Sequence, residues 1–124
     1  MGHFLIVFAG AGLGGAARHA VNLAAARLGL AFPWGTLAVN VAGSVLMGVL
    51  AAWFVARTGV PQHVKLFLTT GLLGGFTTFS AFSLDAALLW ERGAFVPLAL
   101  YVAGSVALSV AGLFAGMAAV RLLG

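Results

Sequence analysis

The sequence predicts an all-α membrane protein of four transmembrane helices, and three observations support this fold class. Of its 124 residues, 63% are hydrophobic and only 6% are charged, whereas a soluble domain needs roughly a quarter of its residues charged. The few charges divide the chain into apolar blocks, and a helix needs about 20 residues to cross a membrane. Glycine and proline gather between the blocks, as is typical of short connections between helices.

The apolar blocks predict spans at residues 4–26, 33–56, 64–89 and 95–121, with each boundary placed to about 2–4 residues. Pro33, Pro61 and Pro97 lie at or near the expected helix starts, where proline is tolerated. We interpret the whole chain, residues 1–124, as a single four-helix domain. There is no cysteine, which excludes a disulfide framework and a thiolate site.

Basic residues are almost evenly divided between the two sides of the membrane. The side with both termini and the middle connection carries Arg57, Lys65 and Arg121, and the opposite side carries Arg27 and Arg92. Because lysine and arginine in short loops set orientation, this near-tie favours insertion in both directions and hence an antiparallel homodimer. A single orientation set by the majority is the alternative. We interpret the net charge of +4 as a signal for topology and lipid headgroups, not as a nucleic-acid site.

Small residues predict close packing between helices or between subunits. Gly10 and Gly14 form a G-xxx-G pair in the first span. Alanines recur every fourth residue in the last span, at Ala103, Ala107, Ala111, Ala115 and Ala119.

The sequence does not predict an enzyme. No acidic residue precedes Asp85, and the three histidines are too scattered to indicate a metal cluster. A hydrolase in the membrane would need a positioned base or an activated nucleophile, and no such arrangement is found. The run "GAGLGGAA" imitates a dinucleotide-binding motif, but no strand precedes it.

Uncharged polar residues follow helical spacing in two spans, so that each set shares one face. The second span has Thr36, Asn40 and Ser44, and the fourth has Tyr101, Ser105 and Ser109. Such side chains either form interhelical hydrogen bonds, worth about 0.6 to 2 kcal/mol each, or line a path for a solute. The presence of two stripes on separate helices favours a lined path.

The stretch "GGFTTFSAFS" predicts a break near the middle of the third span. Gly71, Gly74 and Gly75 each weaken a helix by about 1 kcal/mol relative to alanine, and Thr77 and Thr78 follow at once. Broken backbone in a membrane persists only where its polar groups find other partners. Carbonyls freed between Gly74 and Thr77 are therefore expected to suit a small cation.

Phe79 and Phe82 lie three residues apart, beyond the predicted break. A phenyl ring has a negative face and a positive edge, so rings turned edge-on offer weak, uncharged donors to an anion. Ordinary aromatic packing is the alternative interpretation.

Three motifs together resemble the Fluc (CrcB) family of fluoride channels, over nearly the entire chain. They are "GTLAVNVAGSVLMG" at 35–48, "GLLGGFTTFSAFS" at 71–83 and "GGAARH", which contains Arg18. The resemblance implies a small four-helix protein of the cytoplasmic (inner) membrane that forms antiparallel, dual-topology homodimers. It also implies a passive channel that exports fluoride from the cytoplasm.

The resemblance implies a role for each matching residue. Asn40 would be the pore amide that coordinates the anion, and the ring edges of Phe79 and Phe82 would contact fluoride. A polar track on the fourth helix would comprise Tyr101, Ser105 and Ser109. The backbone carbonyls of Gly74 and Thr77 would hold a structural sodium ion, Na⁺, at the dimer axis. Ala81 and Asp85 depart from the family pattern, which commonly has threonine and glutamate there.

Two alternatives to a channel belong to other functional classes. A proton-coupled exporter of cationic compounds, resembling small multidrug transporters, would need a carboxylate in the first helix, but residues 1–84 contain no Asp or Glu. A non-conducting assembly subunit fits the composition but leaves the two polar stripes unexplained.

Overall fold

The computed structural model describes all 124 residues, and every regular element in it is helical. The long helices are α1 (Gly2–Ala26), α2 (Trp34–Ala56) and α6 (Phe95–Leu123), and the third long segment is Gln62–Glu91. All four are long and apolar enough to cross a membrane. The shortest has 23 residues and measures about 35 Å at a rise of about 1.5 Å per residue. The chain is a multi-pass membrane protein, and the predicted four spanning helices are confirmed.

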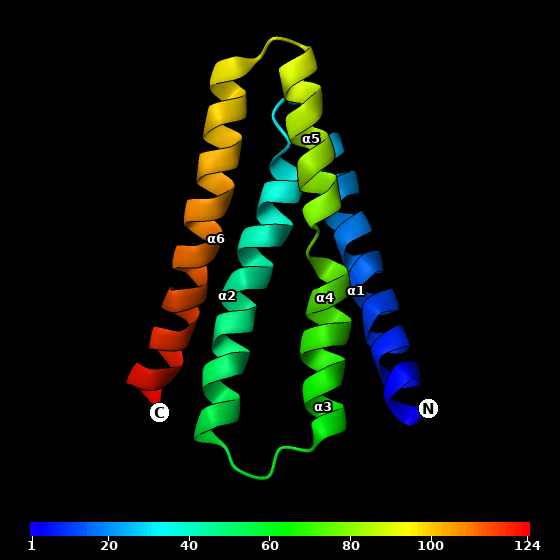
Figure 1. Ribbon diagram of the computed structural model, residues 1–124, viewed down its shortest axis with the longest axis vertical. Helices are drawn as coiled ribbons and strands as arrows, with labels where there is room; N and C mark the ends of the chain where they lie inside the picture. The colour runs from blue at the N-terminus through cyan, green and yellow to red at the C-terminus, as the bar shows by residue number, and fades with distance from the viewer.

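The four segments run up and down between two ends of the molecule (Figure 1). One end carries both termini and the connection between α2 and the third segment, residues 57–61. The opposite end carries the connections at residues 27–33 and 92–94. This arrangement places the basic residues of the two sides as the sequence analysis assigned them.

The third segment is divided into four pieces and an extended joint. The pieces are α3 (Gln62–Leu66), the π-helical η1 (Phe67–Leu73), α4 (Gly74–Phe76) and α5 (Phe79–Glu91). Thr77 and Thr78 form the joint, with φ/ψ of −84°/159° and −153°/122°. A side-chain cap starts α5, because the Ala81 amide donates to Thr78 Oγ1 at 3.1 Å. The predicted break is therefore confirmed.

The glycine cluster itself remains helical, so the break lies later than the glycines suggested. Instead, these glycines allow a close approach to α1. A Cβ on Gly75 would collide with the carbonyl oxygen of Ala11, and one on Gly71 would lie 3.1 Å from Gly10 Cα. The β-branched Thr77 and Thr78, which favour extended backbone, form the actual joint.

The helices associate as two closely packed pairs, α1 with η1 and α4, and α2 with α6. Glycines bring the backbones together in both pairs. A Cβ on Gly14 would collide with the carbonyl oxygen of Leu72, and one on Gly48 would collide with that of Leu113. The G-xxx-G motif of the first span thus packs within the chain, as small residues in membrane helices often do.

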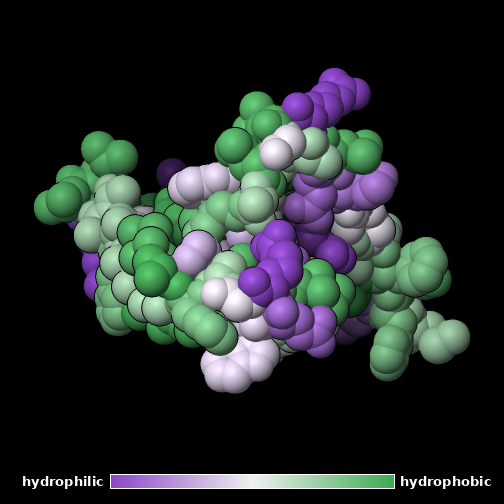
Figure 2. Space-filling view, turned by 90° about the horizontal axis from the view of Figure 1, so that it is seen from above, coloured by the Kyte–Doolittle hydropathy of each residue, from purple (hydrophilic) through white to green (hydrophobic).

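The five regularly spaced alanines of α6 are all exposed on the single chain. The contact of α6 with α2 uses Gly112 and Gly116 instead. Only 14 of the 124 residues are buried, so most apolar side chains face outward, where a lipid or a partner can cover them. Figure 2 shows the molecule from the end that carries the connections at residues 27–33 and 92–94. In this view hydrophilic residues gather near the middle, and hydrophobic surface lies on either side.

Candidate functional site

A cavity of about 400 Å³ lies among α2, the third segment (including its joint and α5) and α6. Five predicted pore residues line it, namely Asn40, Phe79, Phe82, Ser105 and Ser109. Gly74 and Thr77, the predicted cation ligands, also line it. The structure thus brings residues from three separate spans to one space.

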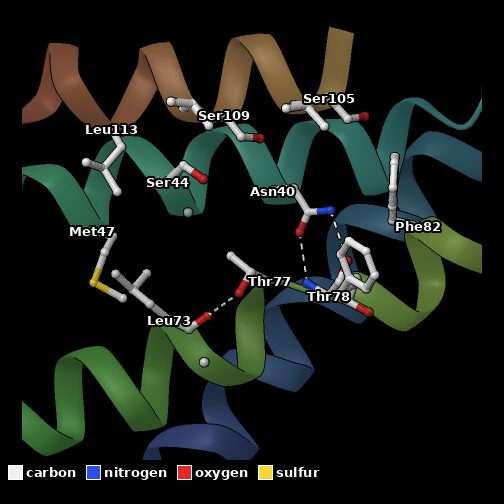
Figure 3. A pocket seen from close by; sticks show the side chains of 15 residues that line it. Asn40, Ser44, Met47, Leu73, Thr77, Thr78, Phe82, Ser105, Ser109 and Leu113 are labelled. Atoms are coloured by element: carbon white, nitrogen blue, oxygen red, sulfur yellow. Dashed lines mark hydrogen bonds between the residues drawn. The ribbon is translucent and has the colours of Figure 1, made fainter. Parts of the chain in front are cut away.

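The polar lining of the cavity consists of neutral groups. Ser44 from α2 and Ser105 and Ser109 from α6 line it together with Asn40 (Figure 3). Ser105 is 6% exposed, and its buried hydroxyl has no hydrogen-bond partner. An unsatisfied buried hydroxyl is costly, so this group needs a hydrogen-bond partner that the single chain does not supply. No Asp or Glu lines the cavity.

The cavity is apolar at its other end. Met47 from α2, Leu73 from η1 and Leu113 from α6 gather there, away from Phe82 (Figure 3). The lining therefore changes along the cavity from hydrogen-bonding groups near Asn40 to hydrocarbon near Met47.

The aromatic side chains form a continuous row beside the cavity. The ring centroids of Phe79 and Phe82 are 5.6 Å apart, and those of Phe82 and Tyr101 are 5.1 Å apart. Phe32 meets Tyr101 edge-on at 5.6 Å. Phe79 is 78% exposed, so this chain alone encloses only one side of the aromatic pair.

Tyr101 lies behind the cavity wall instead of lining it. Its side chain is fully buried, and its hydroxyl donates to Asp85 Oδ2 at 2.9 Å. Asp85, which departs from the family pattern, therefore has a defined partner 16 residues away. It also lines a second cavity of about 440 Å³, which Glu91 and Arg92 share near the end of the molecule.

The joint in the third segment is held by side chains from the first two helices. The Asn40 amide makes two hydrogen bonds to the backbone of Thr78. Arg18 Nε donates to the carbonyl oxygen of Gly75 at 3.2 Å. Neither Arg18 nor Thr78 has a specific role that the sequence alone predicts, and the only signal for them is their place within the family motifs.

The carbonyls predicted to hold a cation remain free of backbone donors. The Thr78 amide, which would bond Gly74 in a continuous helix, bonds Asn40 instead. The Ala81 amide, which would bond Thr77, bonds the Thr78 hydroxyl. The Thr77 hydroxyl turns back to the carbonyl of Leu73 at 3.0 Å. Two free carbonyls suit a hard cation but form only part of a coordination shell.

This chain is similar in sequence to known proteins over nearly its whole length. The family model described as "CrcB-like protein, Camphor Resistance (CrcB)" matches residues 5–117. A protein of Methylobacterium nodulans named "Fluoride-specific ion channel FluC" is 64% identical over 120 residues, which cover 97% of each chain. A protein of the same name from Methylobacterium sp. strain 4-46 is 60% identical, and the match covers 97% of each chain. Another from Rhodopseudomonas palustris strain BisB5 is also 60% identical, and the match covers 95% of this chain and 96% of the relative. With nearly its whole length matched, this chain belongs to the CrcB family.

Proposed function

We propose that this protein is a fluoride-selective channel through which fluoride leaves the cytoplasm passively. Relatives at 60–64% identity are named fluoride-specific ion channels. The observation that carries the proposal in this structure is the neutral cavity in which the Ser105 hydroxyl has no protein partner. Such a group can donate to an anion without the fixed charge that would trap it.

Selection of fluoride follows from replacement of its water shell by closely spaced donors. The serine hydroxyls, the Asn40 amide and the ring edges of Phe79 and Phe82 supply such donors along one cavity. Conduction requires binding weak enough for release, which favours several neutral sites over one cation. Tyr101 supports this path from behind, through its ring contact with Phe82.

The proposed location is the cytoplasmic membrane. Hydrogen fluoride is neutral and enters a cell exposed to acid, where it dissociates and the anion is trapped. A passive path across this membrane lets the trapped anion leave down its gradient. A proton-coupled cation exporter is not favoured, because no carboxylate lines the main cavity.

The functional unit we propose is an antiparallel homodimer with its two-fold axis in the membrane plane. Basic residues are nearly balanced between the two sides, and five alanines of α6 remain exposed. Phe79 is 78% exposed although it lines the cavity. A second copy would cover this ring and complete the pore wall, as two-fold contacts are reciprocal.

A structural sodium ion at the dimer axis is part of the same proposal. The carbonyls of Gly74 and Thr77 have no backbone donors, and carbonyl oxygens coordinate alkali cations. The axis would repeat this pair of ligands and so complete the coordination shell. The ion would hold the two joints together.

The decisive experiment measures ion release from liposomes that contain only this purified protein. We expect rapid fluoride efflux, an associated membrane current and negligible chloride efflux. Chloride release at a similar rate would contradict selectivity. Electrically silent fluoride release that requires a proton gradient would indicate a transporter instead of a channel.

Replacing Ser105 with alanine separates conduction from stability. We expect Ser105→Ala to lower fluoride efflux about tenfold, which corresponds to about 1.4 kcal/mol. The thermal unfolding temperature should stay the same or rise, because the lost hydroxyl has no partner in the protein. Ser83→Ala is the matched control, since Ser83 is exposed on α5 outside the cavity. Unchanged efflux in Ser105→Ala would remove this hydroxyl from the path.

A further inference from the structure

The Asn40 side chain and the Thr78 backbone bind each other at both polar ends. Asn40 Nδ2 donates to the Thr78 carbonyl oxygen at 3.0 Å, and the Thr78 amide donates to Asn40 Oδ1 at 2.8 Å (Figure 3). The pair joins α2 to the extended joint across 38 residues of sequence. Thr78 is the residue before α5, and neither its N–H nor its C=O takes part in a backbone–backbone hydrogen bond among the turns, loops and helix caps.

This double contact fixes which end of the amide points where. A backbone N–H can only donate and a backbone C=O can only accept. The oxygen of Asn40 must therefore face the Thr78 amide, and its nitrogen must face the Thr78 carbonyl. A flipped amide would oppose donor to donor and acceptor to acceptor, and would lose both hydrogen bonds.

The polarity of this amide matters because Asn40 lines the cavity. Its nitrogen carries two hydrogens, and Thr78 accepts one of them. No protein atom accepts the other. An N–H attracts an anion, whereas an amide oxygen would repel it and attract a cation. Whether Asn40 serves an anion thus depends on which way its amide is turned against the Thr78 backbone.

We infer that the Thr78 backbone is a specificity-determining element, which locks the Asn40 amide with one N–H free for an anion. This inference rests on the proposed fluoride channel and adds the group that fixes its polarity. The extended conformation at residues 77–78 makes the lock available, since a continuous helix would use the Thr78 amide internally. The Ala81 amide donates to Thr78 Oγ1 at 3.1 Å, so the side chain of Thr78 is also fixed, by the first turn of α5.

The amide can be observed directly, because the chain contains only two asparagines, Asn22 and Asn40. Protein labelled with ¹⁵N-asparagine in lipid should give two side-chain NH₂ signals by NMR. We expect the Asn40 amide to be rigid about its Cβ–Cγ bond, and only one of its two protons to shift on addition of sodium fluoride. Sodium chloride should leave both protons in place. Asn22, whose side chain makes no hydrogen bond in the structure, provides the internal reference.

Removal of the lock tests its effect on conduction. Replacing residue 78 by the α-hydroxy analogue of threonine exchanges its amide N–H for an ester oxygen and keeps the side chain. Because the ester also weakens the Thr77 carbonyl of the proposed sodium site, efflux is compared at low and at saturating sodium, and a loss that saturating sodium restores would be assigned to that site and not to the lock. We expect fluoride efflux to fall at least tenfold. The matched control is the same backbone change at Ser83, which removes one N–H within α5 away from the cavity and should change efflux less than twofold.

Each outcome decides one of the two proposals. Equal effects of the two esters would overturn the lock, as would rapid reorientation of the Asn40 amide about its Cβ–Cγ bond in protein that conducts fluoride. Shifts of both amide protons or of neither would also overturn it. Absence of fluoride efflux from unmodified protein would overturn the proposed channel, whereas the mobility of the Asn40 amide about its Cβ–Cγ bond would still test the lock.

Discussion

Replacement of Phe82 by isoleucine is expected to lower fluoride efflux about thirtyfold. Isoleucine keeps hydrophobic bulk but has no quadrupole, so the positive ring edge is lost. A desolvated cation over a ring face gains about 2 kcal/mol; with the same scale for an anion at the ring edge, the loss corresponds to about a thirtyfold change in rate. Efflux from liposomes with a fluoride-sensitive electrode measures this directly.

Stability must be followed in the same variant, because Phe82 also packs against Phe79 and Tyr101. Each aromatic pair contributes about 0.5–1.5 kcal/mol beyond its buried area, so a lower unfolding temperature is expected. Phe114→Ile is the control, since Phe114 is 64% exposed on α6 and does not line the cavity. Full efflux from Phe82→Ile would exclude edge-on coordination by this ring.

Replacement of Gly14 by alanine is expected to lower both folding stability and efflux. The new Cβ would collide with the carbonyl oxygen of Leu72 and lie 2.8 Å from the Phe76 amide. Both are backbone atoms, so α1 and the third segment must move apart. Overpacking typically costs about 1–3 kcal/mol. The same movement would separate Arg18 from the Gly75 carbonyl and displace the joint that carries the phenylalanines.

Gly12→Ala provides a control of identical chemistry two residues away. Nothing lies within 4 Å of a Cβ at Gly12, and alanine favours a helix by about 1 kcal/mol over glycine. The unfolding temperature of Gly12→Ala should therefore stay constant or rise, while that of Gly14→Ala falls. Equal effects of the two changes would show that backbone contact at Gly14 does not determine the packing.

Local patterns in the sequence were sufficient to predict the spans and to bring several of the predicted pore residues to one cavity, whereas the roles of these residues stay predictions. The apolar blocks are longer than the hydrocarbon region requires, so each observed segment begins and ends within two residues of the predicted one. Period-four spacing on rigid helices placed Asn40, Ser105 and Ser109 on faces that meet at the cavity. Dimerisation and the bound sodium stay predictions.

Contacts between distant residues could not be predicted in the same way. The bonds from Asn40 to Thr78, from Tyr101 to Asp85 and from Arg18 to Gly75 depend on how separate helices pack. The extended joint also changes the direction in which α5 presents its side chains. A helical projection drawn through the whole third segment therefore misplaces the faces beyond residue 77.

The glycines illustrate why composition alone was ambiguous. A glycine weakens a helix and also permits close backbone contact, and the sequence does not distinguish these effects. At Gly75 close contact with Ala11 explains the residue, whereas the joint forms at Thr77 and Thr78. The identity of the neighbour, known only from the fold, decides between the two.

The four segments bring the chain back to the side where it began, so Met1 and Gly124 lie at one end (Figure 1). A short hydrophilic tether from the last residue of one copy to the first residue of the next would keep both copies pointing the same way. A tandem gene product with oppositely directed halves therefore needs an odd number of additional membrane crossings in its tether. Parity of crossings thus limits how two such channels can be joined in one polypeptide.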